Sequence, residues 1–171
     1  MAKEKIVIGR SDIVDLPEFS ISNIKAKIDS GAYTSSIHCS KPKLSIVEGK
    51  KRISFYILDN LQEQINNKEF YSEEYTERTI KNSFGQSERR FIIKTKLTIF
   101  NRIIRTEFSL SDRKNMKHPI LLGRKFLKGR FIVDVSKFNL SYKQKRKKAK
   151  KKSSENFKPK NIKPDATDHT F

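Results

Sequence analysis

Apolar and polar residues alternate with a period of two along much of residues 1–142, where β-branched and aromatic side chains are frequent. Such alternation is typical of strands that bury one face. The clearest case predicts an antiparallel hairpin that turns at Asn101-Arg102. The residues that would face inward on this hairpin are Phe91, Ile93, Leu97, Ile99, Ile104, Phe108 and Leu110.

Further strands are predicted at residues 5–8, 24–28, 52–58 and 130–135. Long helical periodicity is hard to find, so we expect a mainly β fold in which these strands form a small closed or half-closed β-barrel. Residues 60–75 are polar with sparse apolar positions, which predicts a loop or a short helix inserted into the barrel. Turn residues at 82–86 predict a hairpin tip, and a short helix is expected after Gly123.

The composition changes after residue 142. Residues 143–163 contain eleven Lys or Arg and one acid, a large share of the formal net charge of +19. Because this stretch has almost nothing to bury, we expect a domain at 1–142 followed by a disordered, low-complexity basic tail at 143–171. A chain of 171 residues is long enough for one domain with a core, but too short for two ordinary ones.

A basic tail could attract RNA, ribosomes or acidic proteins through non-specific electrostatics. It could equally be a solvated tail that keeps the protein in solution, since no aromatic residue for base stacking lies between Lys143 and Lys152. The single cysteine, Cys39, excludes an internal disulfide framework. We see no signal-peptide core and no apolar run of about 20 residues that would span a membrane, so a cytoplasmic protein is expected.

One short motif suggests chemistry. The alternating residues 24–28 lead into Asp29-Ser30-Gly31-Ala32, so a strand would deliver one carboxylate into a tight turn of small residues. Taken alone, this tripeptide is ordinary turn chemistry, in which Asp bonds its own backbone and Gly supplies a positive φ. A second element favours a functional interpretation of this turn, because residues 119–124 form an apolar run that ends in Gly123-Arg124.

Together and in this order, the two elements resemble the retropepsin-like aspartic endopeptidases, and more closely a bacterial family named ATP-dependent zinc proteases. Two positions depart from the family pattern, which usually has Thr at the place of Ser30 and often a basic residue at that of Tyr33. The matching segments are Ile8-Gly9-Arg10, Leu16-Pro17, Lys25 to Ala32, Thr34-Ser35, Ile37-His38, Glu88 to Ile93, Leu110, Asp112-Arg113, Met116, Leu121 to Arg124 and Ile132 to Asp134.

The resemblance implies a retropepsin-like barrel and an aspartic-type endopeptidase with Asp29 as the catalytic residue. One aspartate cannot be general acid and base at once, and no second Asp-Ser-Gly occurs, so the resemblance implies a homodimer that pairs two copies of Asp29. The alternative is that the second carboxylate comes from the same chain, in which case Asp134 would be the partner of Asp29. The supporting residues would be Ser30, Gly31, Ala32, Leu122, Gly123 and Arg124, and the flap over a peptide substrate would contain Ser83, Phe84 and Gly85.

The family name implies zinc and ATP, but the residues favour neither. His38 and Cys39 are adjacent, so on a strand they would point to opposite faces, and such pairs rarely bind one tetrahedral ion together. No phosphate-binding Gly-x-x-x-x-Gly-Lys-Ser/Thr loop occurs, so we expect no cofactor, and ATP dependence would come from a partner such as an ATP-grasp glutamate ligase. The alternative function is a catalytically silent β domain that docks on RNA or the ribosome through the basic tail.

Overall fold

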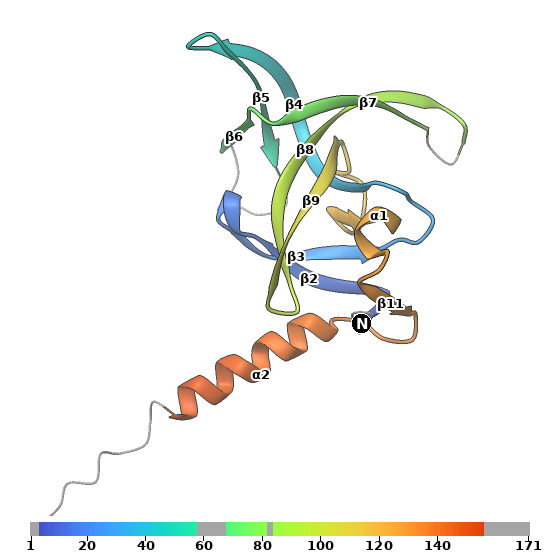
Figure 1. The fold of residues 1–171 in the computed structure, drawn as a ribbon, viewed down its shortest axis with the longest axis vertical. Helices are drawn as coiled ribbons and strands as arrows, with labels where there is room; N and C mark the ends of the chain where they lie inside the picture. The colour runs from blue at the N-terminus through green and yellow to red at the C-terminus, as the bar shows by residue number, and fades with distance from the viewer. Residues whose placement is uncertain (1–3, 58–67, 82–83, 156–171) are drawn as a thin grey trace, which may run out of the picture.

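The computed structural model describes residues 4–57, 68–81 and 84–155 (Figure 1). The strands in chain order are β1 (Ile6–Gly9), β2 (Ser11–Leu16), β3 (Ile21–Ile28), β4 (Ser35–Val47), β5 (Lys50–Ile57), β6 (Glu69–Ser72), β7 (Tyr75–Lys81), β8 (Ser87–Ile99), β9 (Arg102–Ser111), β10 (Ile120–Leu122) and β11 (Phe131–Asp134). The helices are the 3-10 turn η1 (Pro17–Phe19), the short α1 (Arg124–Leu127) and the longer α2 (Leu140–Glu155).

The main sheet closes on itself. Its strands follow the order β10, β3, β2, β8, β9, β4, and β10 then pairs with β4 as well as with β3. The mainly β fold predicted from the sequence is therefore confirmed, and the expected closed barrel corresponds to this ring of six strands. Strands β5 and β6 continue the sheet beyond β4, while β7 pairs with β8 as a long hairpin (Figure 1).

A single apolar core fills the ring. It is built from fully buried side chains on different strands, among them Leu16, Ile24, Ile37, Leu97 and Phe108. Outside the ring, β1 and β11 form a separate parallel pair, and Phe131 of β11 stacks on Phe126 of α1 with ring centroids 5.5 Å apart. This pair therefore fixes α1 against the body.

The predicted hairpin is confirmed as β8 and β9, with its turn one residue earlier than expected. Phe100 and Asn101 both have positive φ, as a two-residue primed turn requires. The strands predicted at 5–8, 24–28, 52–58 and 130–135 correspond to β1, β3, β5 and β11, and the helix expected after Gly123 is α1. The hairpin tip predicted at 82–86 joins β7 to β8, although residues 82–83 lie outside the described part of the chain.

Five of the observed strands, β2, β4, β6, β7 and β10, were not predicted, and β4 and β7 are the longest of these. Strand β4 buries Ser35, Ser36 and His38, so its inward face is partly polar, and a register shift between Ser40 and Lys43 breaks the alternation. Strand β7 is mostly exposed and carries no inward apolar row. The loop or helix expected at 60–75 is corrected in its last part, because 69–72 form β6 along β5; residues 58–67 are not described.

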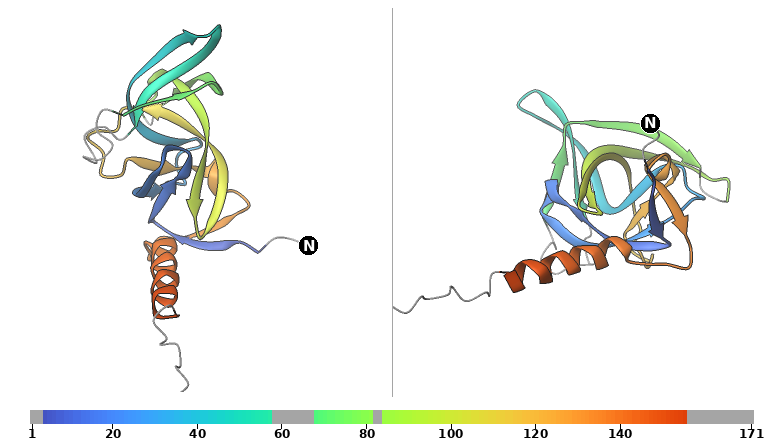
Figure 2. Two further views of the ribbon diagram at one scale, coloured as in Figure 1. Left: turned by 90° about the vertical axis from the view of Figure 1, so that its left-hand side faces the viewer. Right: turned by 60° about the horizontal axis from the view of Figure 1, so that its bottom comes forward.

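The prediction of disorder from residue 143 is wrong for residues 143–155. They continue α2, which starts at Leu140 and leaves the body of the protein (Figures 1 and 2). Lys, Arg, Gln and Ala have high helix propensity, so the segment can be helical without burying an apolar face. Residues 156–171, the rest of the expected tail, lie outside the described chain. Among the described residues, no helix is long and apolar enough to cross a membrane.

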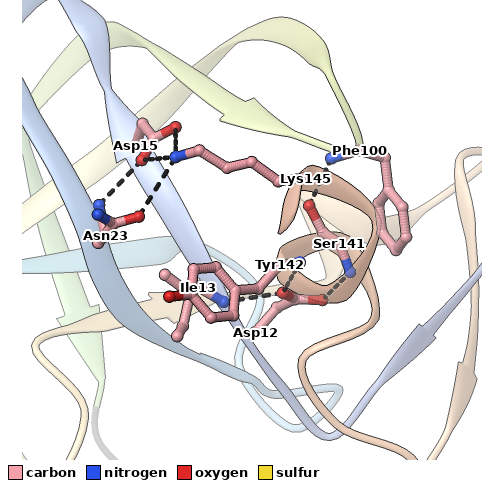
Figure 3. A network of polar contacts seen from close by, with 8 residues as sticks. All are labelled: Asp12, Ile13, Asp15, Asn23, Phe100, Ser141, Tyr142 and Lys145. Carbon is pink, nitrogen blue, oxygen red and sulfur yellow. Dashed lines mark hydrogen bonds and ion pairs between the residues drawn. The ribbon is translucent and has the colours of Figure 1, made fainter. Parts of the chain in front are cut away.

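The first turn of α2 is held by buried polar contacts (Figure 3). The carboxylate of Asp12, on β2, accepts the backbone N–H groups of Ser141 at 2.9 Å and Tyr142 at 3.1 Å, as well as that of its neighbour Ile13 at 2.8 Å. Free N–H groups at a helix start favour such an anion. The Ser141 hydroxyl in turn accepts the N–H of Phe100 from the β8–β9 turn at 2.6 Å. One buried carboxylate thus joins the ring to the start of α2.

Substitution of Asp12 by Ala should destabilise the protein, because three buried or part-buried N–H groups lose their acceptor. We expect a loss of about 2–4 kcal/mol in the free energy of unfolding, measured by urea denaturation. Glu73→Gln, a change at an exposed carboxylate, is the control and should cost less than about 0.5 kcal/mol. Equal stability of Asp12→Ala and the control would contradict the role given to this carboxylate.

Candidate active site

The turn that carries Asp29 and the apolar run at residues 119–124 lie side by side. Strand β10 runs parallel to β3, with Leu122 opposite Ile28, and the N–H of Asp29 donates to the carbonyl of Leu122 at 3.0 Å. On its other side β10 pairs antiparallel with β4. The turn after β3 is therefore attached to the last residue of β10, and Leu122 is fully buried behind it.

Asp29 occupies a tight turn at the surface. Its Oδ1 accepts the N–H of Gly31 at 2.9 Å, as expected for a turn of this type, and its side chain retains 25% of its exposure. The Nζ of Lys27 lies 3.7 Å from Oδ2. Gly31 does not have the positive φ that the turn motif suggested. Its role is steric instead, because a Cβ there would lie 3.1 Å from Asp29 Oδ1.

Gly123 and Arg124 hold the loop that follows Asp29. A Cβ on Gly123 would lie 2.8 Å from the carbonyl oxygen of Tyr33 and 2.9 Å from that of Ala32, so only glycine allows this close approach. The guanidinium of Arg124 donates to the carbonyls of Ser30 at 2.9 Å and Gly31 at 2.8 Å. The six predicted support residues therefore meet within one chain, around the turn that carries Asp29.

A groove of about 930 Å³ opens at this turn. The β7–β8 hairpin forms its other side, and Phe84, next to the hairpin tip, lines the groove while remaining 91% exposed. Of the predicted flap residues, Phe84 thus shares a groove with Asp29, Gly85 follows it with a φ of 80°, and Ser83 lies outside the described residues. The charged residues that line the groove are Asp29, Arg78, Lys81, Arg90, Arg113 and Arg124.

The charge of this groove was not predicted from the sequence. Five of its lining residues are cationic and Asp29 is its only acid, within the part of the chain that the structure describes. Burial lowers the pKa of Arg113, the nearby charge of Arg90 lowers it further, and the carboxylate of Asp29 acts in the opposite direction. Arg113 therefore lies within electrostatic reach of both Arg90 and Asp29. Basic residues dispersed over distant segments give no local pattern, so only the fold brings them together.

Asp134, the alternative intrachain partner, is used elsewhere. Its Oδ1 accepts the N–H of Ser136 at 3.0 Å and the hydroxyl of Ser136 at 2.6 Å, and Lys137 lies 3.0 Å from Oδ2. The hydrogen bonds from Ser136 and Lys137 lower the pKa of Asp134 to about 2. It closes a turn after β11 and does not line the groove with Asp29. The structure therefore gives Asp29 no acidic neighbour in this groove from the described residues.

The residues next to the turn do not fit a zinc site. The Nδ1 of His38 accepts the backbone N–H of Arg113 at 2.8 Å, and both His38 and Cys39 are buried in β4. His118 has a lowered pKa because it is partly buried and surrounded by cations, above all Lys117, Lys27 and Lys25. No group of three or more His, Cys, Asp or Glu side chains suited to a metal occurs among the residues with described positions. Through this hydrogen bond, His38 instead fixes the position of the segment that carries Arg113.

Comparison with known families agrees with this geometry. Residues 7–146 match the family described as "Retropepsin-like aspartic endopeptidase RimB". The match covers the ring of strands, the Asp29 turn, the β7–β8 hairpin and the first part of α2.

The chain is also similar to longer proteins. It is 35% identical over 130 residues to a "Probable alpha-L-glutamate ligase" of Desulfotalea psychrophila, and 33% identical over 138 residues to a protein of the same name from Shewanella pealeana. These alignments cover 76% and 80% of the chain but only 28% and 30% of the relatives, so the chain spans less than a third of their length.

A solved structure has the same fold. A Legionella pneumophila protein of unknown function superposes with a TM-score of 0.65 at 19% identity, covering 81% of this chain and 99% of that one.

Two glycine substitutions would test how the turn is held. Gly123→Ala should lower the free energy of unfolding by roughly 1–3 kcal/mol, because its Cβ would collide with backbone atoms that cannot move independently. Gly31→Ala should cost less, since its Cβ would meet only the side chain of Asp29. Urea denaturation of both variants measures the difference. A larger loss for Gly31→Ala would mean that the close approach at Gly123 is unimportant.

Proposed function

The chain belongs to the RimB-like family of retropepsin-like aspartic endopeptidases, and we propose that it hydrolyses peptide bonds with Asp29 as its catalytic residue. The observation that carries this proposal is the position of Asp29. Its carboxylate lies in a turn that is braced by Gly123 and Arg124, and it lines a groove that a long hairpin borders. A turn that only connected two strands would not need this bracing.

In the proposed mechanism, two carboxylates held close together share one proton, because both cannot be ionised at that distance. The ionised carboxylate takes a proton from a water molecule as that water attacks the amide carbonyl. The protonated carboxyl donates a hydrogen bond to the developing oxyanion. The two apparent pKa values would belong to the pair, and activity would follow a bell-shaped pH profile.

The second carboxylate would come from a second copy of the chain. Asp29 has no acidic partner among the described lining residues of its groove, and Asp134 is held in its own turn. Ser30 and Gly31 are exposed, so another turn can approach this one. Large apolar side chains also surround the groove, with Tyr33 60% and Met116 57% exposed. A homodimer across this surface would pair the two Asp29 side chains and cover apolar area.

The charge of the groove supports an acidic substrate. Arg90 and Arg113 repel each other, although Arg90 is also paired with Glu88 at 2.7 Å. Asp29 is the only described carboxylate that lines the groove with them. A peptide that carries carboxylates would relieve this repulsion and could form charge-assisted hydrogen bonds with either guanidinium. Glu107 does not serve this purpose, because it is already paired with Arg78 at 3.0 Å and with Lys125 at 2.6 Å, which lower its pKa.

The relatives suggest which acidic substrate this is. They are named for joining glutamate, and one segment of each is similar to this chain. We therefore propose that the enzyme cleaves peptides rich in glutamate, acts in the cytoplasm, and operates on the products of an ATP-grasp glutamate ligase. Any dependence on ATP would then belong to the ligase.

Substitution of Asp29 by Asn should lower kcat by about 1,000-fold or more, because the general base is lost while the turn can still form. Cleavage of a hexaglutamate peptide, followed by chromatography, is the measurement. Asp134→Asn is the matched control and should keep its activity. Loss of activity in a folded Asp134→Asn variant would favour an intrachain pair. Full activity of a strictly monomeric protein in sedimentation would exclude the homodimer mechanism.

Substitution of Arg113 by Gln should weaken the binding of acidic peptides. We expect KM for hexaglutamate to rise roughly 10- to 100-fold, the effect of one lost charge-assisted hydrogen bond, with a much smaller change for a neutral peptide. Arg113→Lys should restore part of the difference because it keeps the charge. The exposed Lys114→Gln is the control. Equal changes for acidic and neutral peptides would show that Arg113 only supports the fold.

A further inference from the structure

Helix α2 concentrates positive charge outside the groove. Residues 143–152 contain eight Lys or Arg and no acid, and every side chain from Lys143 to Ser154 is exposed. None of the residues of α2 lines the groove at Asp29. Figures 1 and 2 show the helix leaving the ring and extending away from it. This charge therefore has no place in the proposed peptide hydrolysis.

The helix is attached to the ring at one end only. Asp12 accepts two N–H groups of its first turn, and the Nζ of Lys145 contacts both oxygens of Asp15, at 3.0 and 2.8 Å, and Oδ1 of Asn23 at 3.2 Å (Figure 3). These contacts use one of the eight cations and set the direction of the helix. The basic residues from Arg146 onward have no comparable described contact with the strands and face solvent.

The distribution of these cations indicates the kind of partner. Successive helical residues differ by about 100° around the axis, so the six Lys and Arg side chains from Arg146 to Lys152 spread over about two thirds of the helix circumference. From Lys143 to Glu155, the part of this segment that the structure describes, there is no large apolar side chain. Protein interfaces depend on buried aromatic and apolar anchors, whereas nucleic-acid interfaces are polar and strongly positive. The surface therefore fits a nucleic acid better than an acidic protein.

The helix also repels itself. Pairs four residues apart, such as Lys147 with Lys151 and Lys148 with Lys152, place like charges on neighbouring turns. A polyanion that runs along the helix would remove this repulsion and release its own counterions. In double-stranded RNA the major groove is narrow, so the two rows of phosphates that flank it lie close together, and a helix that is positive over most of its circumference can contact both rows from outside the groove.

We propose that α2 is a docking helix for RNA, which binds the phosphate backbone of an RNA duplex without reading its sequence. The anchored first turn holds the helix so that bound RNA lies away from the peptide groove. The proposal does not depend on the hydrolytic activity, because the groove and the docking helix share no residue.

A charge-neutralising variant tests this proposal in the full chain. Gln replaces lysine at four positions of α2, Lys147, Lys148, Lys151 and Lys152, because Gln keeps high helix propensity. The matched control replaces Lys50, Lys51, Lys114 and Lys128 by Gln, which removes the same charge from exposed sites elsewhere. Binding to a labelled 20-base-pair RNA duplex is measured by anisotropy over a salt series. Circular dichroism and hexaglutamate cleavage verify that both variants are folded and unchanged at the groove.

We expect the α2 variant to bind RNA about tenfold or more weakly and to lower the slope of log Kobs against log salt by roughly 3, near one unit per lost phosphate contact. The control should lose much less. Equal losses in the two variants would overturn the proposal in favour of general charge attraction. A larger loss of poly-L-glutamate than of RNA binding would assign α2 to an acidic protein, and equal binding of a DNA duplex would overturn the choice of RNA.

Discussion

The pairing of the three-residue strand β10 with both β3 and β4 is the constraint on which the rest of the structure depends. It closes the ring around the core and places Leu122 beside Asp29. The next two residues, Gly123 and Arg124, then reach the loop after Asp29 from behind. A short apolar strand thus performs two tasks, since the same backbone that seals the sheet also positions the carboxylate.

The sequence predicted the parts of the fold in which local pattern and tertiary packing agree. Hairpin β8–β9 has an inward row of apolar side chains that Thr95 interrupts in β8, and the Asp29 turn has residue types that turns favour. Strand β4 was missed because its inward face includes Ser35 and His38, whose partners come from distant segments. Helix α2 was missed because its stabilising acceptor, Asp12, precedes it by well over a hundred residues.

The groove was only half predicted, again because part of it depends on contacts between distant segments. Asp29, Gly123 and Arg124 belong to compact motifs, so their proximity could be inferred from a resemblance. Arg90 and Arg113 come from β8 and from the segment after β9. Both lie in segments that match the family, but the resemblance assigned neither of them a role at the site. The positive charge of the groove is a collective effect. It arises only because the fold brings several cations from separate segments into one groove with a single acid. The charge of such a groove depends on how the chain folds and cannot be seen in a local sequence motif.

The attachment of α2 by its first turn makes the helix a lever. Sixteen residues at 1.5 Å each give a length of about 24 Å. A tilt of about 10° at Asp12 would therefore move the far end by roughly 4 Å, given that length. A spectroscopic label on Ser154, which is exposed on the last turn, would magnify any small rotation of β2. The movement of the far end of α2 would therefore report distortions of the ring that are too small to measure directly.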